Sequence, residues 1–204
     1  FFLNWRMLKS ELCDALNAAA NQGEWLLVVK LCEKYEIECI SKGIALNPSN
    51  VPLYSVHLLA YLILGDLNNA RFLWKRIPSE VKTHDTELQQ VWEIFTNMWK
   101  RNYGAVYHCI NTKQWSPTLQ GTISTLQDFY RARALQLICK GYSTITVERG
   151  SQLLGMTPEQ LCEYLSSKQW KQEGNIFHVE PIQSPHEQSI NLDNLTRYLV
   201  FLES

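Results

Sequence analysis

Side chains that could bind a metal or attack a substrate are scattered along this 204-residue chain instead of being grouped. The histidines form no His-x-His pair and no His-Glu-x-x-His motif, the spacings at which zinc enzymes present their ligands. His108 and Cys109 are adjacent within a predicted helix, so their side chains point to different faces. We therefore interpret the histidines as packing or surface residues, and we predict no metal site and no cofactor. They are His57, His84, His108, His178 and His186.

The cysteines form no catalytic or metal-binding motif either. No Cys-x-x-Cys pair occurs, and most of the thiols fall on apolar faces of predicted helices, where cysteine packs as a small hydrophobe. We expect reduced thiols and a location in the cytoplasm and nucleus. A Cys–His nucleophile pair would meet only in the folded chain, so the sequence leaves that alternative open. Because no residue is singled out, we predict that the chain is not an enzyme and has no small-molecule substrate. The cysteines are Cys13, Cys32, Cys39, Cys109, Cys139 and Cys162.

The charge balance provides little attraction for polyanions. The 19 Lys and Arg residues nearly cancel the 20 Asp and Glu residues, for a formal net charge of −1. Such a chain has no strong field to collect nucleic acid or an anionic membrane. We interpret its basic clusters as solvated helix ends or faces, where cations in a last turn favour the helix dipole. Recognition of a partner's carboxylates is the alternative. The clusters are Lys75-Arg76, Lys100-Arg101 and Arg131-x-Arg133.

Membrane and export signals are missing from the sequence. No run of about 18 apolar residues occurs, so we predict no membrane span and no membrane partner. The N-terminus lacks the charged segment and small-residue cleavage site of a signal peptide, and it does not begin with methionine. We expect a chain that is trimmed or truncated at that end.

The stretch Tyr61–Pro78 indicates how the chain folds. Its spacing fits two antiparallel helices joined at Gly65-Asp66, where glycine can adopt a positive φ. Ala70 is small enough to let the two helices approach closely, and Trp74 fills the space toward the next pair. Such a pair cannot bury its own apolar face, so it needs similar neighbours, as in a helical solenoid.

Similar pairs repeat along the first half of the chain. A polar cap, a bulky apolar residue and two further apolar positions recur from Glu24, from Asp66 and from Asn102, spaced by about 40 residues. This period is typical of tetratricopeptide-type helix pairs; an irregular helical bundle is the alternative. The predicted helices are 4–20, 24–42, 51–64, 67–77, 87–101 and 102–111, with a polar stretch over 79–86.

A long helix then leads into a different pattern. Ser116 and Pro117 suit the cap and first turn of a helix over 118–140, which is long enough to belong to two domains. Its predicted buried side comprises Leu119, Ile123, Leu126, Phe129, Tyr130, Ala134, Leu137 and Ile138. After it we predict a strand over 142–147, a helix over 148–154, a helix over 157–170, and a hairpin in which a turn over 171–175 joins two short strands, the second over 176–179. This is the order of a winged-helix module.

The predicted winged helix suggests a binding role. In a DNA-binding protein of this type, the third helix would enter the major groove. However, residues 146–181 contain five carboxylates and only three cations. This balance disfavours nucleic acid as a partner, because phosphate contacts need cations. We favour a protein–protein module whose hairpin edge accepts another strand. Ile176 and Val179 are its predicted interaction residues.

The last segment has the widest apolar surface. Its leucines are spaced three, four and three residues apart, as in an a/d seam, and its aromatic residues widen the apolar face. A helix that is apolar on several sides favours enclosure in a bundle, so we predict contacts with helices of other chains; packing back on the winged helix is the alternative. The predicted contact residues are Leu192, Leu195, Tyr198, Leu199 and Leu202.

These elements predict a mainly α fold. It comprises a tetratricopeptide-like helical-repeat solenoid, a winged-helix subdomain and a C-terminal helix. The corresponding ranges are 1–117, 118–181 and 191–204, with a linker over 182–190.

Four sequence blocks in this order resemble the PCI domain, which is named after subunits of the proteasome lid, the signalosome and a translation initiation factor. In that family, helical repeats run through a long helix into a winged helix. The blocks are most similar to signalosome members, and the resemblance covers residues 24–204. The first helix matches nothing in the family, and the linker before the last helix is shorter than the family's. The blocks are Asn68–Pro78, Gln114–Ser116, Gly141–Ile145 and Leu195–Glu203.

The resemblance implies a function. The signalosome removes the ubiquitin-like modifier NEDD-eight from cullins and so regulates cullin–RING ubiquitin ligases. Its isopeptidase chemistry belongs to a subunit with a zinc-binding His-x-His motif, which this sequence lacks. The resemblance therefore implies a non-catalytic scaffold subunit in a hetero-oligomer. Its winged helix would join an arc of other PCI subunits, and its last helix would join their common bundle. A proteasome-lid-type PCI scaffold and a nucleic-acid-binding winged-helix adaptor are the alternatives.

Overall fold

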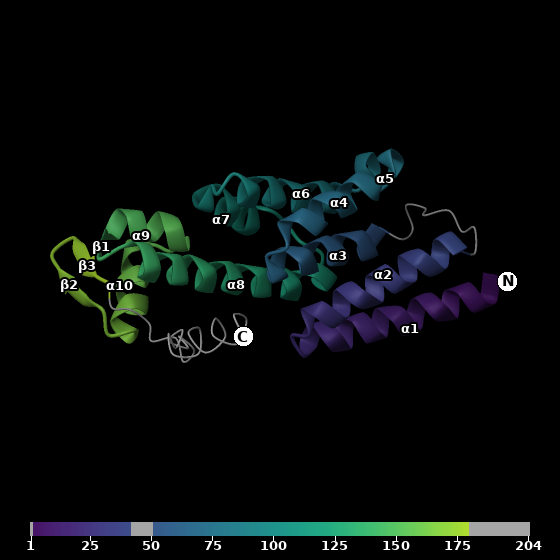
Figure 1. Ribbon diagram of the computed structural model, residues 1–204, viewed down its shortest axis with the longest axis horizontal. Helices are drawn as coiled ribbons and strands as arrows, with labels where there is room; N and C mark the ends of the chain where they lie inside the picture. Colours follow the sequence, from purple (N-terminus) through teal and green to yellow (C-terminus); the bar gives the residue numbers. More distant parts are fainter. Residues whose placement is uncertain (1, 42–50, 180–204) are drawn as a thin grey trace, which may run out of the picture.

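The computed structural model describes residues 2–41 and 51–179 of the chain. The molecule is elongated, with a helical hairpin at the N-terminal end and a small sheet at the other (Figure 1). The helices of the first half are α1 (Phe2–Asn21), α2 (Trp25–Ser41), α3 (Val51–Leu64), α4 (Leu67–Arg76), α5 (Ser79–His84), α6 (Thr86–Trp99) and α7 (Tyr103–Thr112). The second half contains α8 (Pro117–Gly141), β1 (Thr144–Thr146), α9 (Val147–Leu154), α10 (Pro158–Ser167), β2 (Lys171–Glu173) and β3 (Ile176–His178). The predicted mainly α, PCI-type fold is confirmed.

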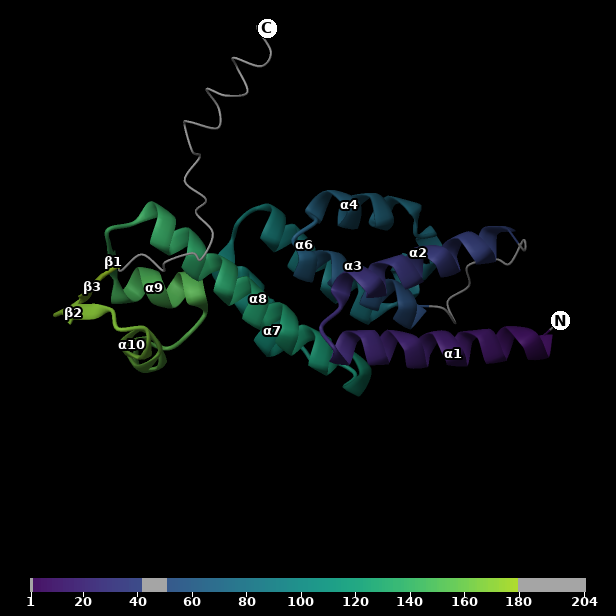
Figure 2. The ribbon, with the colours of Figure 1, turned by 60° about the horizontal axis from the view of Figure 1, so that its bottom comes forward.

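Helix α3 is the centre of the solenoid. It packs against α2, α4, α6 and α8, and every residue from Leu58 to Ile63 is buried. A helix that is apolar on all sides must be enclosed by neighbours. The other helices therefore assemble around α3, and Figure 2 shows it between α2 and α6.

The predicted turn at Gly65 and the predicted caps Asp66 and Asn102 are confirmed. Gly65 has a φ of 74°, in the left-handed region that glycine adopts without strain. Asp66 accepts a hydrogen bond from the backbone N–H of Asn69 at the start of α4. Asn102 accepts the equivalent bond from Ala105 at the start of α7. These side chains satisfy N–H groups that lack partners at a helix start.

Aromatic stacking joins consecutive pairs, as predicted for Trp74. Its ring lies parallel to that of Trp92 at a centroid separation of 4.3 Å. Trp92 in turn stacks on Phe95 at 4.2 Å. Within the pair itself, Ala70 is fully buried and α4 packs against α3, as predicted.

Helix α8 joins two hydrophobic clusters. Its first half, from Leu119 to Tyr130, packs into the solenoid core. Its second half, from Ala134 to Ile138, packs with α9, α10 and the sheet. The element order after α8 is that of the predicted winged helix, and Thr157 forms the predicted cap of α10 within a reciprocal capping box with Gln160. The predicted domain boundaries remain a prediction.

Some local predictions were wrong. Residues 79–84 form α5, whose single buried apolar residue, Val81, gave too little periodicity to reveal a helix. The predicted turn over 171–175 contains β2, and only Gly174 and Asn175 form the turn. Phe129 and Leu137 were predicted on the buried side of α8, yet they are 50% and 52% exposed.

Within the described residues, no helix combines the length and hydropathy needed to cross a membrane. The same part of the chain contains no cluster of three or more metal-ligating side chains.

Candidate interaction surfaces

Two buried titratable side chains of the described chain, Cys32 and His57, are held in their neutral forms. Burial raises the pKa of the Cys32 thiol to about 12. Burial and the nearby Arg76 guanidinium lower the pKa of His57 to about 3. A protonated thiol is a poor nucleophile. Both side chains therefore serve to pack the core, and residues available for interaction lie on the surface of the molecule.

Two of the basic residues interpreted as solvated also form tertiary contacts, although the Arg76 side chain remains 49% exposed. Arg76 forms a bidentate ion pair with Glu36 of α2, whose side chain is only 11% exposed. Arg131 donates to the backbone carbonyls of Leu154 and Gly155 at 3.2 and 3.5 Å, at the C-terminus of α9. Both partners are distant in sequence, so local patterns gave no sign of these contacts.

The winged-helix sheet places the predicted residues Ile176 and Val179 on different faces. Side chains alternate along a strand, and the intervening Phe177 is fully buried. Ile176 therefore lies on the outer face, where it is 42% exposed. Val179 packs against the core of the winged helix. Their role in binding remains a prediction, but they do not form a single patch.

The sheet order decides which strand could accept a partner. The order is β1–β3–β2, so β3 is central and is hydrogen-bonded on both sides. The edges of the described sheet are β1 and β2. A strand added from another chain would therefore pair with Thr144–Thr146 or Lys171–Glu173.

Helix α10 is acidic on its exposed surface. Glu159 and Glu163 are exposed, and the cation Lys168 lies 6.0 Å from the ring centroid of Tyr164. This charge distribution repels a phosphate backbone.

The other predicted contact residues, Leu192, Leu195, Tyr198, Leu199 and Leu202, lie outside the described residues.

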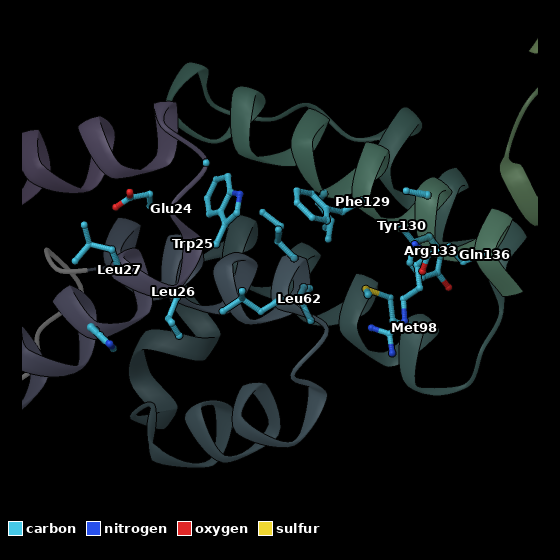
Figure 3. Close-up of a pocket in the computed structure, with 16 residues that line it drawn as sticks. Glu24, Trp25, Leu26, Leu27, Leu62, Met98, Phe129, Tyr130, Arg133 and Gln136 are labelled. Atoms are coloured by element: carbon cyan, nitrogen blue, oxygen red, sulfur yellow. The ribbon is translucent and has the colours of Figure 1, made fainter. Parts of the chain in front are cut away.

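An apolar groove between α2, α3 and α8 is a surface that the sequence did not reveal (Figure 3). Its volume is about 970 Å³. Its floor consists of buried residues, including Leu62 of α3 and Leu126 of α8. Large apolar side chains also remain exposed along its rim: Leu26, Leu27, Leu64 and Phe129.

Figure 3 shows Leu26 and Leu27 on the α2 side of this groove and Phe129 and Arg133 on the α8 side, with Leu62 between them. Exposed apolar side chains around a concave floor are typical of a docking surface. The helical periodicity of the sequence places Phe129 on the apolar side of α8. Periodicity does not show whether another element of the same chain covers this side chain.

A second hollow of about 740 Å³ adjoins the groove. It lies between α1 and α8, and Trp25 lines both hollows. The rest of its lining is small or polar: Asn17, Ala20, Asn21, Pro117, Thr118, Gly121, Thr122 and Thr125.

Comparison with known proteins assigns the family. The model of the CSN8/PSMD8/EIF3K family matches residues 48–190, more than half of the chain. The chain belongs to this family. The CSN8/PSMD8/EIF3K family is PCI-type, so the predicted resemblance is confirmed.

Relatives within the CSN8/PSMD8/EIF3K family match this chain over most of their lengths. The COP9 signalosome complex subunit 8 of Xenopus tropicalis is 33% identical over 181 residues, which are 85% of this chain and 90% of the relative. The Arabidopsis thaliana protein of the same name is 31% identical over 86% of this chain and 91% of its own length. The corresponding protein of Dictyostelium discoideum is 33% identical over 86% and 90%.

Proposed function

We propose that this chain is a non-catalytic scaffold subunit of a COP9-type signalosome. Similarity to subunits of that name over most of both chains carries the proposal. The chain would support the removal of NEDD-eight from cullins by a catalytic subunit, and hence the regulation of cullin–RING ubiquitin ligases. It would work in the cytoplasm and nucleus.

The fold supplies surfaces suited to this role. The edges β1 and β2 can pair with a strand of a neighbouring PCI-type subunit. The leucine seam of residues 191–204 can enter a bundle with helices of other subunits. In this proposal the chain contributes contacts and positions its neighbours, and the other subunits contribute the chemistry.

Co-purification from cells tests the proposal. The tagged full chain is compared with a variant carrying Leu195→Ser and Leu199→Ser, which breaks the seam. The matched control carries Asn194→Ser and Thr196→Ser, which alters the same segment off the seam. We expect mass spectrometry to find signalosome subunits with the full chain and the control. The seam variant should recover roughly tenfold less, while the isolated chain keeps its unfolding midpoint.

Equal recovery with the seam variant would count against a bundle role for this segment. Recovery of proteasome lid subunits in place of signalosome subunits would overturn the assignment itself. The family description spans both kinds of protein, so this readout distinguishes them directly.

A further inference from the structure

A face of α8 that winds gradually around the helix axis lines both hollows described above. Residues about one turn apart contribute to it, and the series runs from Pro117 to Gln136. At 1.5 Å per residue this face spans about 28 Å along the helix axis. The shape fits an elongated ligand better than a small molecule. The members of the series are Pro117, Gly121, Thr125, Phe129, Arg133 and Gln136.

The walls of the hollows favour a helix as that ligand. None of the described strands lines either hollow, and the α8 residues of the groove, from Leu126 to Gln136, lie in the interior of a helix that bonds their backbone groups internally. An extended segment would find no strand edge here and would leave its own backbone groups unpaired. A helix satisfies its own backbone and needs only an apolar stripe to fill the groove.

The charges around the groove indicate which charge the partner should carry beside its apolar stripe. Lys30 and Arg133 line it, and neither forms an ion pair with a described residue. Among the described residues that line the two hollows, Glu24 is the only acid. Acidic residues beside the partner's apolar stripe would therefore be attracted to the rim.

We propose that this face of α8 is the docking site for an amphipathic helix of another polypeptide. At the end near Phe129 and Arg133, the bound helix carries large apolar residues flanked by Asp or Glu. At the end near Thr118 and Thr125, it carries small or polar residues. The inference concerns the isolated chain and does not require that the chain belong to a signalosome.

Fluorescence anisotropy with designed peptides tests this proposal on the full chain. The probe is a labelled helical peptide of about 18 residues with leucines at i, i+4, i+7 and i+11 flanked by glutamates. Its counterpart replaces every glutamate with lysine. We expect the glutamate peptide to bind roughly tenfold more tightly at physiological ionic strength, and the preference to shrink at high salt.

Substitutions on the rim are compared with matched surface controls. Phe129→Ser should weaken binding of the glutamate peptide roughly tenfold, since an exposed aromatic anchor is lost. Lys30→Glu combined with Arg133→Glu should reverse the preference between the peptides. Two exposed residues outside the groove provide controls, because Ile37→Ser on α2 and Lys75→Glu on α4 should change neither result.

Methyl NMR of the leucines locates the bound probe independently of substitutions. Perturbation of Leu26, Leu27 and Leu64 supports the proposal. Lack of binding, equal binding of both peptides by the wild type, or perturbation confined to other surfaces overturns it. A competition experiment compares the unlabelled probe with a peptide of residues 191–204. If the 191–204 peptide displaces the labelled probe at the lower concentration, the proposal is overturned, because the groove would then bind the chain's own C-terminal segment.

Discussion

Protonation of His57 should control stability under mildly acidic conditions. This side chain lies on α3 at the centre of the solenoid, is only 2% exposed, and stacks on Tyr61 at 4.8 Å. Its Nε2 has no hydrogen-bond partner among the described residues. Burial, assisted by the Arg76 cation, lowers the pKa of His57 from 6.5 to about 3.

The direction of the effect follows from the two pKa values. As the pH falls below about 6.5, the unfolded chain binds a proton at His57, while the folded chain stays neutral until about pH 3. The unfolded state therefore binds more protons throughout this window, and the free energy of unfolding decreases as the pH falls. Above pH 6.5 His57 is neutral in both states, so the protein retains its full free energy of unfolding there. Each pKa unit corresponds to about 1.4 kcal/mol, so moving from about pH 7.5 to about pH 5 should cost about 2 kcal/mol.

Urea unfolding at a series of pH values measures this loss. Tryptophan fluorescence gives the free energy of unfolding for the wild type and for His57→Phe, which keeps an aromatic ring at this position but cannot titrate. The variant should lose about 2 kcal/mol less than the wild type across the same range. His84→Gln, which removes an exposed histidine from α5, controls for histidine content and should follow the wild type.

NMR titration of His57 tests the assigned protonation state directly. The Cε1–H resonance of His57 should not shift between about pH 7.5 and about pH 5 in the folded chain. Should it titrate near 6.5, or should wild type and His57→Phe show parallel pH profiles, the assignment of a dry, neutral histidine at the centre of α3 would be wrong.

Two further predictions concern backbone approach and a buried charge. Gly155 and Gly174 both have a φ of 61°, but a Cβ at Gly155 would lie 2.2 Å from the Tyr107 ring, whereas one at Gly174 would meet nothing within 4 Å. By urea unfolding, Gly174→Ala should therefore cost about 1 kcal/mol and Gly155→Ala about 3; equal losses would exclude the ring contact as the cause. Arg76→Ala leaves the nearly buried Glu36 carboxylate unpaired and should cost about 2 kcal/mol, while adding Glu36→Gln should restore part of the loss in a double-mutant cycle. A further loss on adding Glu36→Gln would contradict that reasoning.

Local chemistry made much of the fold predictable. Gly65 and Asp66 specify a turn and a cap through their own conformational and hydrogen-bonding preferences, and the structure confirms both. Thr157 and Pro158 likewise define the start of α10. Such signals depend on residues a few positions apart, so one sequence contains them completely.

The candidate docking surface could not be predicted because exposure depends on the whole fold. Phe129 and Tyr130 both matched the apolar pattern of α8, but only Tyr130 is covered by the solenoid. The same limit applies to Arg131, whose partners Leu154 and Gly155 come from α9 and the turn after it. Periodicity identifies an apolar position, and only the packing of other elements decides whether it faces a core or a partner.

The contacts of Arg131 also explain how the winged helix is fixed to the solenoid. Its guanidinium bonds the end of α9 and lies 5.8 Å from the ring centroid of Tyr107 in α7. That ring packs directly against Gly155, where any side chain would collide with it. Because α8 crosses from one hydrophobic cluster to the other, these contacts hold the sheet edges at a defined position relative to the groove. A helix bound along α8 and a strand paired with β2 would then be kept in a fixed mutual orientation. If the chain is the scaffold subunit proposed above, this fixed geometry would set the positions of its neighbouring subunits.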